Sequence, residues 1–117
     1  MTKLEATYVK YGMDYDATIE RCAGDEQLLL QLLCMFACDG NFDALCCAFG
    51  SGDTQAAFRA AHALKGSSGM LGMTQLHLVL RDMTECLRRG DISSAAAYRN
   101  SAEREYETVS EMIKSIC

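Results

Sequence analysis

Proline and tryptophan are missing from this 117-residue chain, and histidine occurs only twice. Because proline is the residue that most strongly interrupts a helix, its absence leaves glycine as the main signal for where helices end. Positive charge is also scarce: 11 lysines and arginines stand against 16 acidic residues, for a formal net charge of −5. That sign argues against a protein that binds nucleic acid through the phosphate backbone.

Long apolar runs are absent as well. No window approaches 18 uninterrupted apolar residues, and the first residues lack the basic and apolar regions of a signal peptide. We therefore expect a soluble, cytoplasmic protein that does not associate with a membrane. The length suits a single domain, residues 1–117, with a modest core and no room for a separate nucleotide-binding module.

Cysteine is the most unusual part of the composition. The seven cysteines are odd in number, and a chain that is 50% hydrophobic needs no disulfide scaffold to supply a core. We interpret them as reduced thiols that pack between helices. A metal site that includes Cys34 and Cys38, or a redox role for Cys86 or Cys117, has weaker support because no CxxC spacing is present.

Glycines divide the chain into segments rich in alanine, leucine, methionine, glutamate and arginine, which are helix formers. A short helix is expected from Asp14 or Asp16 to about Cys22, and a second begins at Asp25. The second carries apolar residues at intervals of three and four, which predicts a buried stripe of Leu28, Leu29, Leu32, Leu33, Phe36 and Ala37.

After a break near residues 39–41, helical spacing continues to residues 50–52. Three more helices are expected: from Asp53 or Thr54 to about residue 72, from Thr74 to about residue 89, and from Asp91 or Ser93 to the end. No segment alternates with a period of two, so strands are not expected. The simplest fold is all-α, an up-and-down antiparallel four-helix bundle with one or two short extra helices at the N-terminus.

The middle two helices have clear inner faces. On the first, the residues expected to face the core are Ala57, Ala60, Ala61, Leu64 and Ser68. On the second, they are Leu76, Val79, Leu80, Met83 and Leu87. His62 lies opposite the first set and is therefore predicted to be accessible to solvent. Its own face includes residues three, four or seven positions away, namely Phe58, Arg59, Lys65, Gly66 and Gly69.

Two glycines on this face call for an explanation, since glycine inside a helix costs about 1 kcal/mol relative to alanine. We interpret Gly66 and Gly69 as clearance that lets a second protein approach the imidazole. Arg59 and Lys65 would favour a dianionic phosphoryl group near the ring. Residues 53–90 also carry five basic and three acidic residues, which would attract an acidic surface.

Histidine is a suitable nucleophile for reversible phosphoryl transfer, because one imidazole nitrogen can be unprotonated near neutral pH. The sequence contains neither a P-loop nor a kinase glycine-rich loop, and no acidic cluster near His62 that would hold Mg²⁺. We therefore expect a protein that carries a phosphoryl group without taking it from ATP. It is expected to have no cofactor of its own and no bound metal.

A family resemblance supports this interpretation. The segment His62-Ala63-Leu64-Lys65-Gly66-Ser67-Ser68, with Leu71-Gly72 and Leu76 after it, resembles the signature of the histidine-containing phosphotransfer (HPt) domain. Gly24-Asp25-Glu26 and Gly52-Asp53 also fit, so the resemblance covers about residues 14–112. It implies a free-standing four-helix bundle that passes phosphoryl groups between His62 and the aspartates of response-regulator receiver domains in a multistep phosphorelay.

The resemblance also implies roles for particular residues. His62 corresponds to the phosphoacceptor, Lys65 to a residue that supports the phosphoryl group, and Gly66 to the position that gives the receiver room. Where some members place a Gln or Glu that hydrogen-bonds the histidine ring, this chain has Thr84, with Glu85 beside it. The other residues expected near the phosphoryl group are Arg59, Ser67, Ser68, Gly69 and Arg88.

The partners implied are receiver domains, which would supply the Mg²⁺ and the aspartate, and a hybrid sensor histidine kinase. The chain itself is expected to be a monomer. An adaptor that binds a receiver or a kinase through the same face, without transfer, is the alternative function. We interpret the second histidine, His77, as an ordinary surface residue.

Overall fold

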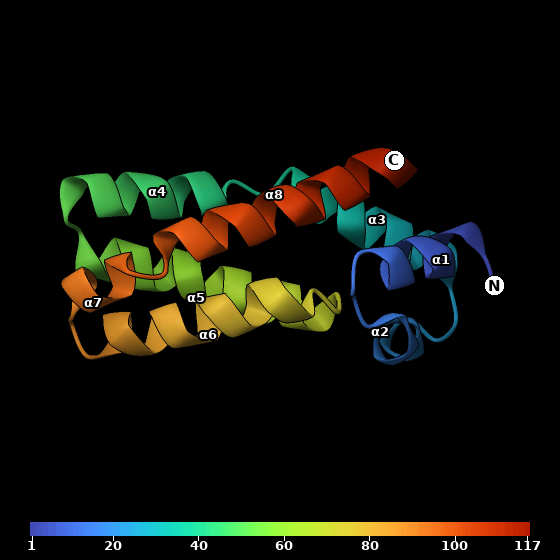
Figure 1. Cartoon of the computed structure of the whole chain (residues 1–117), viewed down its shortest axis with the longest axis horizontal. Coiled ribbons are helices and arrows are strands. Elements are labelled where there is room, and N and C mark those ends of the chain that lie inside the picture. The colour runs from blue at the N-terminus through green and yellow to red at the C-terminus, as the bar shows by residue number, and fades with distance from the viewer.

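A computed structural model describes residues 1–117 and contains eight helices and no strands (Figure 1). The all-α prediction is therefore confirmed. The helices are α1 (Lys3–Lys10), α2 (Tyr15–Arg21), α3 (Glu26–Ala37), α4 (Asn41–Ser51), α5 (Thr54–Met70), α6 (Thr74–Arg88), α7 (Ile92–Ala96) and α8 (Arg99–Ile116).

Four long helical segments lie side by side along a molecule that measures 44 × 21 × 20 Å: the α3–α4 pair, α5, α6 and α8. The broken pair of α3 and α4 runs in one direction, α5 returns, α6 runs back again, and α8 returns once more (Figure 1). Short helices α1 and α2 stand at the end where α5 passes into α6 (Figure 1). This is the predicted antiparallel bundle with short N-terminal extras.

Aspartate side chains fix where four of the helices begin. Asp14, Asp25, Asp53 and Asp91 each accept hydrogen bonds from backbone N–H groups in the first turn of α2, α3, α5 and α7. Such a cap is worth about 1 kcal/mol. The cap at Asp53 sets the start of α5, and with it the face of the bundle on which His62 lies.

The core contains the inner faces that the spacing predicted. Five small or apolar residues of α5 are buried, and they let α5 pack closely between α4 and α6: Ala57, Ala60, Ala61, Leu64 and Ser68. From α6, Leu76, Leu80, Met83 and Leu87 are buried, while Val79 is half-buried. Helix α5, which carries His62, therefore meets α6 along a tightly packed interface.

The predicted stripe on α3 is only partly correct. Leu29, Leu33 and Phe36 are buried, but Leu28 is 39% exposed and Ala37 is exposed. The reason is that α3 has its main helix contacts with α8 and α2, which cover one side of it.

The predicted single C-terminal helix is divided in two. After α7, the N–H of Ala97 donates to Ser94 O and the N–H of Tyr98 to Ala95 O, at 3.2 and 3.0 Å. These three-residue hydrogen bonds tighten the chain into a turn before α8 begins. The turn lets α7 pack on α6 while α8 lies along the bundle.

The segment Glu26–Ser51, which spans α3 and α4, is long and apolar enough to cross a membrane by length and composition, and 22% of the window concerned is buried. Core helices of helical bundles share that length and composition. Here the segment is interrupted before Asn41, and Leu29, Leu33 and Leu45 are buried against other helices.

The N-terminal helices hold the end of α5. The Tyr8 hydroxyl donates to Leu71 O at 2.8 Å, and Arg21 Nη1 donates to Met70 O at 2.9 Å. The N–H of Asp14 donates to the carbonyl of Gly72, also at 2.9 Å. These bonds satisfy carbonyl groups that every helix leaves unpaired at its C-terminus. The two short helices therefore anchor the helix that carries His62.

Candidate functional site

His62 lies in the middle of α5 with its side chain exposed, as predicted. Ala61 and Leu64 point the other way and are almost completely buried. Because α5 is capped at one end and anchored by α1 and α2 at the other, the imidazole projects from a rigid part of the bundle. An accessible ring on a rigid helix can react with a group presented by a second protein.

The position one turn beyond His62 is open. A Cβ added at Gly66 would meet no heavy atom within 4 Å, and no positive φ requires glycine there. Neither the backbone nor the packing of this chain explains the glycine. Room for an approaching partner, the reason predicted from the sequence, remains consistent with this geometry.

Two cations flank His62 without partners in the chain. Arg59 is exposed and Lys65 is half-buried. The two ion pairs of the structure, Arg81 with Asp82 and Arg88 with Glu85, involve neither of them. Their charges are therefore available to an anion near the ring.

Gly69 corrects the clearance interpretation. A Cβ at this position would lie 2.9 Å from His77 Nδ1 and 3.0 Å from His77 Cε1, so the missing side chain makes room for His77 and not for a partner. His77 is not an ordinary surface residue either. Its ring is half-buried, and Nδ1 lies 2.9 Å from Lys65 O, which ties α6 to α5 one turn after His62.

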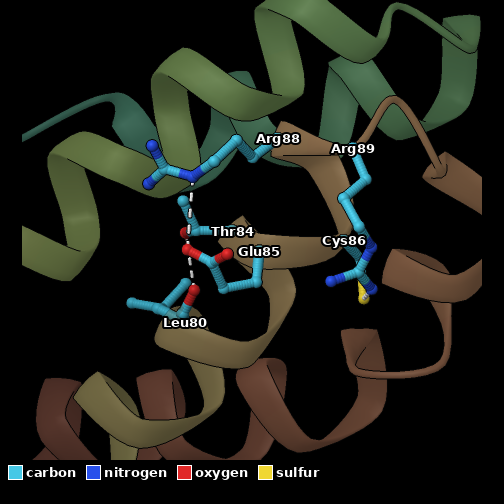
Figure 2. Close-up of polar contacts among 6 residues, drawn as sticks. All are labelled: Leu80, Thr84, Glu85, Cys86, Arg88 and Arg89. Atoms are coloured by element: carbon cyan, nitrogen blue, oxygen red, sulfur yellow. Dashed lines mark hydrogen bonds and ion pairs between the residues drawn. The ribbon is translucent and has the colours of Figure 1, made fainter.

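Thr84 does not lie at the site. It is fully buried, and its hydroxyl donates to Leu80 O at 2.6 Å within α6 (Figure 2). The neighbouring Glu85 is exposed and accepts from Arg88 Nε at 3.2 Å (Figure 2). The hydrogen bond that some family members make to the histidine ring therefore has no counterpart from either residue.

The two serines after Gly66 also bond within their own helix. The Ser67 hydroxyl donates to Ala63 O at 3.1 Å. Ser68 is fully buried and donates to Lys65 O at 3.1 Å. Burial removes Ser68 from the residues expected near the phosphoryl group, while Ser67 is half-buried on the side of α5 that faces α3.

An aromatic contact that sequence reasoning did not assign stands beside His62. The rings of Phe58 and His62 are stacked, with centroids 5.7 Å apart and planes 21° apart. The guanidinium of Arg88 also lies over the Phe58 ring, 5.4 Å from its centroid. Arg88 therefore comes close to the site through Phe58, and no direct contact with His62 is found. The four-residue spacing of Phe58 and His62 was the available signal.

The cysteines are all free thiols. Cys22 is buried, as expected for a thiol that packs between helices. Cys86 is buried too, which corrects its interpretation as an exposed redox thiol, and Cys38, Cys47 and Cys117 are exposed, so the packing interpretation is wrong for these three. Partial desolvation and the neighbouring Cys34 thiol raise the pKa of Cys117 to about 11. No group of three His, Cys, Asp or Glu side chains is placed to hold a metal ion.

Comparison with known proteins gives one match. Residues 18–114 match the profile of the Hpt domain, which leaves α1, the start of α2 and the last three residues outside it. No curated protein and no solved structure matches the chain. The match covers most of the 117 residues and includes His62, Lys65 and Gly66. The chain therefore belongs to the Hpt domain family.

Proposed function

We propose that this protein is a phosphocarrier in which His62 accepts a phosphoryl group from the aspartyl phosphate of one receiver domain and passes it to the aspartate of another. Membership of the Hpt family implies histidine phosphotransfer in a phosphorelay, by a carrier and not a kinase. The observation that supports His62 is its setting: of the two histidines it is the exposed one, beside the open position of Gly66.

The phosphoryl transfer step requires only a few groups from this chain. A nitrogen of the His62 ring attacks the phosphorus of the aspartyl phosphate, a P–N bond forms and the P–O bond to the aspartate breaks. The carboxylate leaves with the electron pair of that bond, while the other ring nitrogen keeps its proton. Arg59 and Lys65 then face the transferred dianion, and the receiver would supply Mg²⁺ for its own phosphate.

Apolar side chains beside the site support a protein as the partner. Met70 follows Gly66 by one turn and is 61% exposed, and Met35 on α3 is 67% exposed. Both line a groove between α3 and α5, together with Leu32 and Phe36. Exposed apolar surface of this kind is typical of an interface with another protein. A receiver that covers this groove would bring its aspartate toward Gly66 and His62.

The cellular location, the oligomeric state and the partners are also part of the proposal. We place the protein in the cytoplasm, where free thiols such as its seven cysteines persist. It would act as a monomer between receiver domains, one of which belongs to a hybrid sensor histidine kinase. No nucleic acid or membrane partner is proposed.

The proposal is tested by transfer of labelled phosphate from a receiver domain phosphorylated on its aspartate. The wild-type chain should acquire an acid-labile, base-stable label. His62→Gln should acquire none, while His77→Gln is the matched control and should be labelled. Label on the His62→Gln chain would contradict the assignment.

The alternative, an adaptor without transfer, makes a different prediction in the same assay. A wild-type chain that binds the receiver but never becomes labelled would replace the carrier by the adaptor. Gly66→Leu refines the test. It should leave helix content nearly unchanged and slow the transfer because the leucine side chain blocks approach; normal transfer would refute the clearance argument.

A further inference from the structure

The orientation of the His62 ring is not fixed by the hydrogen bond expected from the next helix, because that hydrogen bond is missing. Thr84 is buried and bonds to Leu80 O, and Glu85 is paired with Arg88. An exposed side chain without such a contact samples several rotamers, and ordering it costs free energy when the partner arrives. What the structure offers in place of a hydrogen bond is an aromatic ring.

Resting on the proposed function, we infer that Phe58 is a positioning residue that holds the His62 imidazole by ring stacking, and that Arg88 holds Phe58 from α6. The imidazole and phenyl planes are 21° apart with centroids at 5.7 Å, an offset-stacked arrangement. Stacking fixes the plane of the ring but uses only its face. Both ring nitrogens, which lie at the edge, stay available for the phosphoryl group.

Arg88 completes the arrangement. Its guanidinium lies 5.4 Å from the Phe58 centroid, a cation–π contact. Its Nε also donates to Glu85 Oε1 at 3.2 Å, a contact between two half-exposed side chains of α6 that favours this orientation of Arg88 (Figure 2). The order Glu85, Arg88, Phe58 and His62 therefore crosses from α6 to α5. Each exposed contact is weak alone, but the four side chains restrict one another.

The packing of Phe58 makes it suitable for this role. Its ring is half-buried and packs against the core. It stands on α5 four residues before His62, so any rigid movement of the helix carries both rings together. A ring in this place therefore presents His62 to every receiver in the same orientation.

The test uses phosphoramidate, a small P–N phosphoryl donor, so that no receiver is required. Phosphoramidate is protonated on its nitrogen at neutral pH. The His62 nitrogen attacks phosphorus, a new P–N bond forms, the phosphoramidate P–N bond breaks, and neutral ammonia leaves with the electron pair of that bond. Phe58→Leu keeps an apolar side chain but removes the ring, and should slow phosphorylation of His62 by roughly two- to tenfold, the effect expected for one lost aromatic pair. Phe58→Tyr keeps the ring and should restore the rate.

The chain offers a matched control. Phe49 on α4 also carries a cation, the guanidinium of Arg99 at 4.9 Å, but it makes no contact with His62. Phe49→Leu should therefore leave the rate of His62 phosphorylation unchanged. Arg88→Met should slow it less than Phe58→Leu does, because Arg88 acts on His62 only through the Phe58 ring.

Nuclear magnetic resonance tests the contact itself, because a residue that only stabilised the fold would leave the His62 ring resonances unchanged. The ring protons of His62 should shift in Phe58→Leu, through loss of the phenyl ring current, and should keep their wild-type positions in Phe49→Leu. Unchanged His62 resonances in Phe58→Leu, a wild-type rate in that variant, or an equally slow Phe49→Leu each overturn the inference. Failure of receivers to label a chain that phosphoramidate does phosphorylate would instead refute the proposed function.

Discussion

Alanine in place of each interior glycine of α5 should change stability by different amounts, and only Gly66→Ala should be clearly stabilising. Gly66 has open space where a Cβ would stand, whereas at Gly69 a Cβ would lie 2.9 Å from His77 Nδ1. Both glycines have ordinary helical φ values, so the backbone tolerates alanine at either position. The comparison therefore isolates what the His77 ring does.

The magnitudes follow from the contacts. Gly66→Ala gains helix propensity and should raise the free energy of unfolding by about 0.5–1 kcal/mol. Gly69→Ala gains the same amount but displaces the His77 ring from Lys65 O, at a cost of about 0.5–1.5 kcal/mol for the hydrogen bond plus repacking. Because Lys65 O also accepts from Ser68 at 3.1 Å, that carbonyl is not left unpaired. We expect Gly69→Ala to be about 1 kcal/mol less stable than Gly66→Ala.

Urea unfolding of the variants, with a double-mutant cycle, is the assay. In the His77→Ala background the ring is gone, so Gly69→Ala should become as stabilising as Gly66→Ala. The coupling between positions 69 and 77 should be about 1 kcal/mol, within the range of about 0.5–3 kcal/mol that contacting residues show. A Gly69→Ala variant as stable as Gly66→Ala in the presence of His77, with no coupling, would refute the role assigned to that ring.

Further predictions concern the ends of the bundle and the thiols. Gly72→Ala should cost more than 1 kcal/mol, in contrast to Gly66→Ala, since φ there is +74° and a Cβ would collide with the Thr18 hydroxyl; thermal unfolding checks it. The hydrogen bond from Tyr15 to Glu26 raises the Tyr15 pKa from 10.0 to about 12, while hydrogen bonds from Thr2 and Tyr15 lower that of Glu26. The stabilisation from this hydrogen bond should therefore be lost as pH rises from 10 to about 12, and also as pH falls through the lowered pKa of Glu26. Thermal unfolding as a function of pH monitors both losses, and Tyr15→Phe should abolish the one at alkaline pH. Mass spectrometry during thiol alkylation should show the exposed Cys38 and Cys47 reacting before the buried Cys22 and Cys86, with Cys117 slowed by its raised pKa; equal rates for the first two pairs would contradict the burial of Cys22 and Cys86.

Helical spacing was sufficient to predict much of this fold. The alanines of α5 and the leucines of α6 recur at three and four residues, and the aspartates that precede the helices cap them. Because these signals are local, they predict the exposed face of α5 and the accessibility of His62 without any knowledge of the neighbours. The family resemblance supplied the phosphoacceptor role, which spacing alone does not carry.

Contacts between helices could not be predicted in this way. Nothing in the α5 sequence indicates that the notch at Gly69 is filled by His77, because that residue comes from α6. Thr84 is a different case. It follows Leu80 by four residues and precedes Leu87 by three, so the spacing already placed it on the buried face, although its aligned position suggested the site. The division of α7 from α8 depends on packing against α6, which sequence periodicity does not report.

Locating the phosphoryl group on the full-length chain tests directly whether His62 is the phosphoacceptor. After contact with a receiver phosphorylated on its aspartate, the protein is digested under alkaline conditions, which preserve phosphohistidine, and the fragments are sequenced by tandem mass spectrometry. We expect the phosphoryl group on His62 alone. A phosphoryl group on His77, on another residue, or on no residue of a chain that demonstrably binds the receiver would contradict it.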